Sequence, residues 1–197
     1  RKADWSSRWD IQAWDVADKN LLVVGFGRIG SRLVKRALAF DMNVFVYDPY
    51  VDQSDIKKSG AVVVDNYKDI LSKMDAVTLH CPKNDKTTDM FSTEEFNIMK
   101  DSSFLINCAR GGIVNEKALY DALTSNKIRA AGLDVYDDEP STSSNPLFSL
   151  DNILLSPHIA GVTIEATIRM SKQAVQNVLD VFDNKIDPEV IINKNVL

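Results

Sequence analysis

Short apolar runs alternate with segments of helical periodicity from residue 21 onward, and this alternation restricts the fold more than any other feature. The runs lie at 21–24, 43–47, 61–64, 76–79, 104–107, 130–135 and 153–155. They are continuously apolar rather than polar at every second residue, which is typical of strands that are covered on both faces. The pattern therefore predicts an α/β fold, with a doubly wound parallel sheet between two layers of helices.

A glycine-rich turn follows the first predicted strand and opens a helix. Gly25 would allow a tight turn, Gly27 would let the backbone approach a pyrophosphate, and Gly30 would let helix and strand pack closely. Arg28 and Ile29 lie inside the turn, where backbone N–H groups at the helix start can bind phosphate oxygens. For the Arg28 side chain, the alternative is a solvated position at the helix start. The turn in this context predicts a Rossmann-type dinucleotide site.

An acidic residue ends the second predicted strand. Asp48 stands at the distance from the glycine turn at which an acid accepts hydrogen bonds from the adenosine ribose hydroxyls. Its charge would repel a 2′-phosphate, so we expect NAD rather than NADP as the cofactor. The alternative is a turn residue before Pro49.

Three further loops follow predicted strands, where open α/β sheets place their ligands. The loops are 107–112, 132–140 and 156–161. Each delivers one candidate: Arg110, Glu139 and His158. The Arg110 guanidinium fits a carboxylate through two bonds, and the imidazole of His158 suits proton exchange near neutrality. A buried Glu139 beside it would favour imidazolium and fix the ring orientation.

Each of these candidates has an alternative. Arg110 could anchor a cofactor phosphate, and His158 could be a structural histidine with satisfied hydrogen bonds. Glu139 competes with Asp137 and Asp138 in the same acidic run.

The remaining histidine and the two cysteines are interpreted as structural. His80 follows the fourth predicted strand, and we expect a structural rather than a catalytic role for it. Cys81 and Cys108 have no CxxC or Cys/His spacing, so we expect neither a disulfide framework nor a zinc site. We expect no metal, and a reducing cytoplasm as the location.

In combination, the motifs GFGRIG, LHCP, NCARGG, GLDVYDDEP and SPHIAG, in this order, resemble the D-2-hydroxyacid dehydrogenase family of phosphoglycerate, hydroxypyruvate/glyoxylate and D-lactate dehydrogenases. The resemblance runs from about Trp5 to Leu197. It implies that Arg110 binds the substrate carboxylate and carbonyl, that His158 is the acid/base, and that Glu139 is its partner. Asp134 resembles the acid that contacts the nicotinamide carboxamide. The NAD site implied in this way comprises Gly25, Gly27, Arg28, Ile29, Gly30, Asp48, Cys81, Pro82, Cys108, Ala109, Arg110, Asp134, His158 and Gly161.

The resemblance implies an NAD-dependent enzyme that transfers hydride between NAD(H) and a D-2-hydroxy acid or 2-oxo acid, and a homodimer. The alternative is an NAD(H)-sensing, dimerising binding protein of the corepressor type on the same fold.

Three segments are expected along the chain. Residues 1–15 form an arm that holds all three tryptophans, which we expect to pack either on this domain or on a second subunit. Residues 16–161 form the NAD-binding domain, and residues 162–197 form a long amphipathic helix and tail. Family members carry a substrate lobe of roughly one hundred residues, an ordinary domain size. Only about twenty residues precede the first strand here, so we expect that lobe to be mostly absent and the helix to pack against it.

Composition excludes several classes of protein. Hydrophobic residues make up 45% of the 197 residues and charged residues 26%, which is typical of a globular chain. The net charge of −5, with no basic stripe, argues against a nucleic-acid partner. No apolar run approaches the roughly 20 residues that cross a bilayer.

Overall fold

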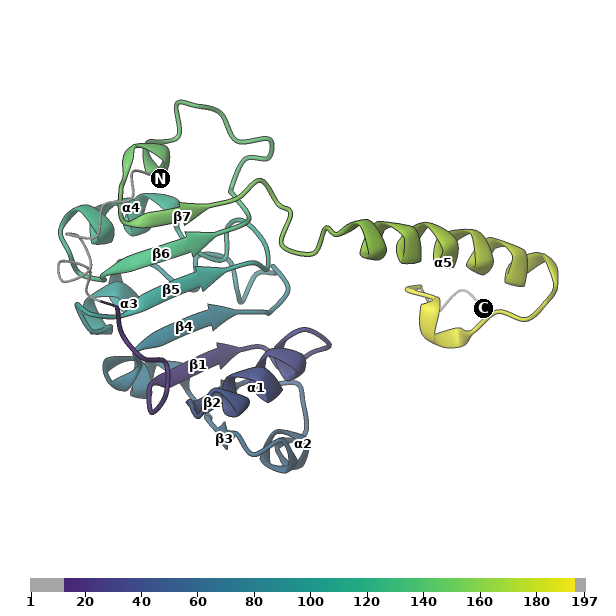
Figure 1. Ribbon diagram of the computed structural model, residues 1–197, viewed down its shortest axis with the longest axis horizontal. Coiled ribbons are helices and arrows are strands. Elements are labelled where there is room, and N and C mark those ends of the chain that lie inside the picture. The colour runs from purple at the N-terminus through teal and green to yellow at the C-terminus, as the bar shows by residue number, and fades with distance from the viewer. Residues whose placement is uncertain (1–12, 194–197) are drawn as a thin grey trace, which may run out of the picture. The chain divides into compact units, whose positions relative to one another are not determined.

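The computed structural model describes residues 13–193. Within this range the chain forms two compact units, residues 13–157 and residues 158–193. Figure 1 shows the parallel sheet of the first unit and the long helix of the second.

Seven parallel strands form one sheet among the described residues (Figure 1). They are β1 (Asn20–Val24), β2 (Asn43–Tyr47), β3 (Val62–Val63), β4 (Ala76–Leu79), β5 (Phe104–Asn107), β6 (Ala130–Leu133) and β7 (Ile153–Leu155). Their order is β3-β2-β1-β4-β5-β6-β7. The chain therefore winds outward from β1 in one direction and then returns to continue from β4 in the other. This confirms the predicted doubly wound α/β fold.

The interior strand β1 is buried on both faces. Leu21 and Val23 belong to one apolar cluster, whereas Leu22 and Val24 belong to a second, larger one. Successive side chains of a strand point to opposite faces, so a strand between two apolar layers must be apolar at every position. This accounts for the continuous apolar runs of the sequence.

Helices and 3-10 turns connect the strands of the first unit. They are α1 (Gly30–Ala39), α2 (Gln53–Lys58), η2 (Tyr67–Lys73), α3 (Thr93–Ile98), α4 (Glu116–Thr124) and η3 (Pro146–Ser149). Asn115 caps α4, because its side chain accepts a hydrogen bond from the N–H of Ala118 at 2.9 Å.

Two strand predictions were too long. The run 61–64 forms a strand only at Val62–Val63. Ala61 is apolar because it is buried in the cluster that includes residues of α1 and α2, not because it belongs to the strand. The run 130–135 ends as a strand at Leu133. Val135 is apolar because it is buried in the following loop, not because the strand continues.

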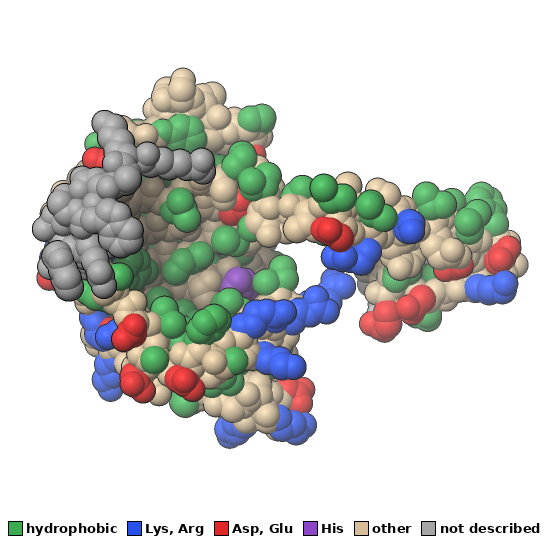
Figure 2. Space-filling model, in the orientation of Figure 1, with side chains coloured by type: hydrophobic (Ala, Val, Ile, Leu, Met, Phe, Trp, Pro, Cys, Tyr) green, Lys and Arg blue, Asp and Glu red, His purple; other side chains and the backbone are tan. Residues whose placement is uncertain are grey.

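The second unit contains α5 (Ile164–Phe182) and the 3-10 turn η4 (Pro188–Val190). The predicted long helix is confirmed, and its Thr163 side chain accepts from the N–H of Ala166 at 3.0 Å. No side chain of α5 is buried, and Figure 2 shows hydrophobic side chains along its surface. Those that are exposed include Ile164, Ile168, Val175, Val178, Leu179 and Phe182. Among the described helices, none combines the length and apolar character that crossing a membrane requires.

One of the three tryptophans lies within the described residues. The Trp14 ring meets the Phe104 ring edge-on, with 6.1 Å between centroids, and the Arg129 guanidinium lies 4.1 Å from its centroid. Trp14 therefore packs on its own domain, at the edge where strand β5 begins. Trp5 and Trp9 lie outside the described residues.

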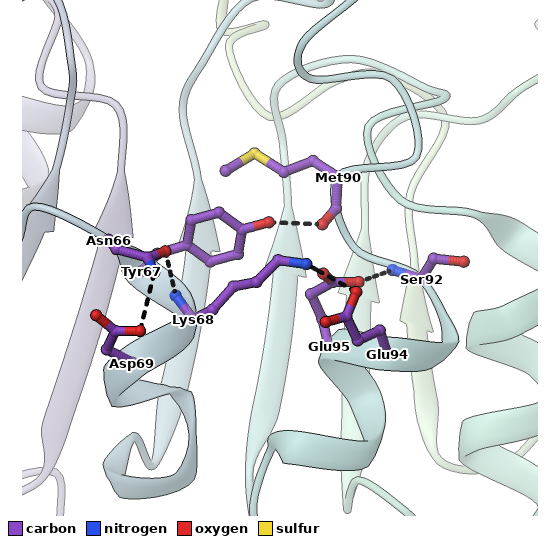
Figure 3. Close-up of polar contacts among 8 residues, drawn as sticks. All are labelled: Asn66, Tyr67, Lys68, Asp69, Met90, Ser92, Glu94 and Glu95. Atoms are coloured by element: carbon purple, nitrogen blue, oxygen red, sulfur yellow. Dashed lines mark hydrogen bonds and ion pairs between the residues drawn. The ribbon is translucent and has the colours of Figure 1, made fainter.

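A polar cluster joins η2 to α3 (Figure 3). The Lys68 ammonium lies 2.8 Å from a Glu94 carboxylate oxygen and 2.7 Å from one of Glu95. The second oxygen of Glu95 accepts from the N–H of Ser92 at 3.0 Å and so caps α3. Tyr67 donates to the carbonyl of Met90 at 3.2 Å, and burial raises the pKa of its hydroxyl to about 12. The cluster fixes the segment that enters α3.

We expect Glu95→Ala to lower the free energy of unfolding by about 1–3 kcal/mol, because it removes a buried cap and leaves the Ser92 N–H without its acceptor. Urea titration of the 197-residue chain would measure the change. Glu94→Ala is the matched control: Glu94 has the same lysine partner, but its side chain is 69% exposed against 5% for Glu95. A change of about 0.5 kcal/mol or less is expected there. Equal losses in the two variants would contradict this account.

Candidate functional site

The candidate site lies at the edge of the sheet where the parallel strands end. β1 has β2 on one side and β4 on the other. The strand order runs outward from β1 through β2 to β3 and from β4 through β5 to β7 in the opposite direction, so the winding reverses between β1 and β4. In open α/β sheets, ligands bind in the crevice at such a reversal, outside the carboxyl ends of the strands.

The glycine turn after β1 is packed so closely that side chains are excluded at two positions. Gly25 has φ +99°, and an added Cβ would lie 2.7 Å from the carbonyl carbon of His80. A Cβ on Gly30 would lie 2.0 Å from the Gly25 carbonyl oxygen. At Gly27, by contrast, no atom lies within 4 Å of an added Cβ. The turn is thus closed toward the protein and open at Gly27.

Asp48 joins the ends of β1 and β2. One oxygen of its carboxylate accepts from the N–H of Phe26 at 2.7 Å, and the other accepts from the N–H of Tyr50 at 2.9 Å. A carboxylate has about four lone-pair positions, so two hydrogen bonds leave acceptor capacity for ligand hydroxyls. The glycine turn and the carboxylate are therefore held in one fixed arrangement.

A cavity of about 320 Å³ lies beside this arrangement. The predicted site residues that line it are Gly25, Gly27, Asp48, Cys81 and Pro82. The other lining residues are Val24, Tyr47, Pro49, Tyr50, Val51, His80, Asn84, Lys86, Thr87 and Met90. Its volume is at the small end for ligand pockets. The open glycine, the acceptor and the apolar walls together fit the adenosine end of a dinucleotide.

The structure gives His80 and Cys81 the character of wall residues. The N–H of His80 donates to the Val24 carbonyl at 2.7 Å, and its ring nitrogen Nε2 lies 3.0 Å from the Thr78 hydroxyl. Burial lowers the pKa of His80, so that its ring is neutral near pH 7. Burial also raises the pKa of the Cys81 thiol to about 11, which disfavours the nucleophilic thiolate.

Arg110 lies in the loop after β5, and its guanidinium is exposed. Its Nη1 donates to the Ala109 carbonyl at 2.6 Å. The buried Asn107 shapes the loop: its side chain accepts from the N–H of Ala109 at 3.0 Å and donates to the Arg110 carbonyl at 2.9 Å. Cys108 lies in the same loop and is exposed as a residue. Its thiol is partly buried, and this desolvation raises the pKa of the thiol.

The loops after β6 and β7 are tied to each other. The carboxylate of the buried Asp134 accepts from the Ser156 hydroxyl at 2.5 Å. The hydroxyl of Tyr136 donates to the Ser156 carbonyl at 3.0 Å. Glu139 is exposed in the loop after β6, and one of its oxygens accepts from the N–H of Tyr136 at 2.9 Å. Arg110 therefore follows β5, and Asp134 and Glu139 follow the adjacent strand β6 on the same edge of the sheet.

His158 begins the second unit and has an unusual backbone conformation. Its φ is +55°. Among the described residues, every non-glycine position with positive φ is an Asp, an Asn or this His, the residue types that are enriched in this region. Such outliers cost about 1–3 kcal/mol and cluster at functional sites. Gly161 lies in the same unit, and an added Cβ there has no atom within 4 Å.

Several residues of the cavity wall were not predicted from the sequence. Tyr50 and Lys86 both line the cavity, and the Lys86 ammonium lies 5.8 Å from the centroid of the Tyr50 ring. The sequence feature that could have identified Tyr50 and Lys86 is their position shortly after β2 and β4, because both strands end at the same edge of the sheet. Arg28, Ile29 and the residues of the later loops do not line this cavity.

Comparison with known proteins places this arrangement in a family. The model for "D-isomer specific 2-hydroxyacid dehydrogenase, NAD binding domain" matches residues 1–160. The chain is 37% identical over 196 residues to a D-3-phosphoglycerate dehydrogenase of Methanocaldococcus jannaschii, a match that covers all of this chain and 37% of that protein. It is 34% identical over 200 residues to a glyoxylate reductase of Korarchaeum cryptofilum, covering all of this chain and 60% of that protein.

Among solved structures, the chain resembles a D-lactate dehydrogenase from Aquifex aeolicus that is complexed with NAD and lactic acid. The TM-score is 0.80 at 33% identity, and the match covers 89% of this chain and 57% of that one. The chain thus spans less than two thirds of the length of each of these three relatives. It belongs to the D-isomer specific 2-hydroxyacid dehydrogenase family, and residues 1–160 correspond to the domain that binds NAD as the cofactor of that family.

Proposed function

We propose that this chain serves an NAD-dependent dehydrogenase that interconverts a D-2-hydroxy acid and the corresponding 2-oxo acid. The observation that carries the proposal is the common edge of the sheet. There, the glycine turn and Asp48 follow β1 and β2, while Arg110 and Glu139 follow β5 and β6.

The first half of this edge would bind the cofactor. Backbone N–H groups at the start of α1 would bind the pyrophosphate, which approaches over Gly27. Asp48 would accept from the ribose hydroxyls and exclude a 2′-phosphate, and the cavity would hold the adenosine. Asp134 would contact the nicotinamide carboxamide. The bound cofactor supplies or removes the hydride.

The second half would bind the substrate and move a proton. Arg110 would bind the substrate carboxylate and carbonyl, for which a guanidinium has the matching fork of donors. His158 would protonate the carbonyl oxygen during reduction and remove the hydroxyl proton during oxidation. Glu139 would stabilise the imidazolium form of His158 and orient its ring.

The substrate would be of the phosphoglycerate or hydroxypyruvate/glyoxylate type, as the names of the relatives suggest. These relatives are named as a dehydrogenase and a reductase, so the comparisons give no support to an NAD(H)-sensing corepressor. The resemblance also favours a homodimer. The acidic composition and the absence of Cys pairing signals favour a cytoplasmic location.

We expect Gly27→Ala to weaken NADH binding to the 197-residue chain at least tenfold, which corresponds to about 1.4 kcal/mol. The added methyl has room in the protein and would collide only with a ligand that lies over the turn. Nicotinamide fluorescence would measure the affinity. Gly132→Ala is the matched control, because its Cβ also has no neighbour within 4 Å and it lies within strand β6. Undiminished NADH affinity in Gly27→Ala would refute the proposed place of the pyrophosphate.

The 197-residue chain alone should bind NADH and yet turn over 2-oxo acids slowly, because closure of a substrate lobe excludes water from such sites. NADH oxidation with glyoxylate, hydroxypyruvate and pyruvate would be followed by absorbance. The same panel, tested on the full open reading frame that contains this chain, would identify the substrate. Rates of order 10 per second from the 197-residue chain, a common enzyme value, would show this expectation to be wrong.

In the full open reading frame, His158→Ala should lower kcat/KM by about 10²–10⁴, the usual contribution of acid/base catalysis, while NADH affinity is unchanged. Stopped-flow turnover and NADH titration would separate the two quantities. The proposed acid/base role fails if this variant keeps the turnover of the unmodified protein.

A further inference from the structure

Tyr136 contacts both loops that carry the proposed acid/base pair. It is buried in the loop after β6, and its backbone N–H donates to one oxygen of Glu139 at 2.9 Å. Its hydroxyl donates to the carbonyl of Ser156 at 3.0 Å. One residue therefore holds the Glu139 carboxylate with its backbone and the end of β7 with its side chain.

Ser156 is the point at which the chain is fixed before it reaches His158. Its N–H donates to the Leu133 carbonyl at 3.0 Å, its hydroxyl donates to Asp134, and its carbonyl accepts from Tyr136. All its backbone and side-chain polar groups are thus bonded to β6 or to the loop that follows it. The next residue, Pro157, has no backbone N–H and cannot anchor the segment by donating a bond.

The Tyr136 hydroxyl stays protonated and can therefore donate the hydrogen bond to Ser156. Burial raises its pKa, and the nearby carboxylates of Asp134, Glu116 and Glu139 raise it further. The group therefore remains protonated across the neutral range. The aromatic ring is held separately, because it meets the Phe148 ring edge-on at 5.7 Å between centroids.

The remainder of the Glu139 loop has its own support. The Glu116 carboxylate, at the start of α4, accepts from the N–H of Asp137 at 2.8 Å and from the Asn145 side chain at 2.9 Å. Loss of the Tyr136 hydroxyl would therefore leave the loop folded and would release only the carbonyl of Ser156.

We propose that Tyr136 is a positioning residue, whose hydroxyl holds Ser156 at the end of β7 against the loop that carries Glu139 and thereby fixes the point from which the chain continues to His158. The inference rests on the proposed function. It assigns a role in the reaction to a side chain that need not touch substrate or cofactor. Misplacement of a catalytic group by about 1 Å can cost up to 10² in rate, so a bond two residues away is sufficient to matter.

The test is Tyr136→Phe in the full open reading frame, since phenylalanine keeps the ring and removes only the hydroxyl. We expect kcat to fall about tenfold, while the affinity for NADH changes less than twofold. The limb of the kcat/KM pH profile that reports the acid/base should also move to lower pH, because Glu139 stabilises the imidazolium form of a displaced His158 less. Tyr120→Phe on α4 is the matched control and should keep both kcat and the profile.

Two results would overturn the inference. One is an unchanged kcat and pH profile in Tyr136→Phe. The other is a parallel loss of kcat, NADH affinity and thermal stability, which would show a purely structural role. Failure of the proposed function would appear separately, as full turnover by His158→Ala, whatever Tyr136→Phe does.

Discussion

The close approach of the glycine turn to the end of β4 is the constraint on which the candidate site depends. A methyl group on Gly25 would overlap the His80 backbone, and one on Gly30 would overlap the Gly25 carbonyl. Because neither position has a side chain, α1 can begin directly over the end of β1. The same closeness brings the Phe26 N–H to the Asp48 carboxylate, so the phosphate loop and the ribose acceptor form one rigid unit.

The strands could be predicted closely from the sequence, because burial on both faces leaves a run without polar interruption. Four of them, β2, β4, β5 and β7, have the expected bounds. The short helices α2 and α3 were missed, since six residues are too few for a helical period to stand out. The end of β6 was misjudged because a buried loop is as apolar as a strand.

For the site, the sequence indicated which residues follow which strands, and the parallel topology brings those ends to one edge. It could not indicate how the loops are held. Asn107 bonds both sides of the Arg110 loop, and Asp134 bonds Ser156 across more than twenty residues of chain. Such contacts depend on side-chain direction in the folded state, and no spacing rule contains that information. The walls of the cavity, including Tyr50 and Lys86, were missed for the same reason.

The sheet is bounded by strands of only two and three residues, β3 and β7. An edge strand exposes backbone donors and acceptors to which a foreign strand can add, which is the first step of β-type aggregation. So short an edge offers an incoming chain only a few hydrogen bonds, whereas the longer strands β1 and β2 are paired inside the sheet. The architecture that gathers the ligand loops at one end thus also protects the nascent domain against cross-β polymerisation while it folds.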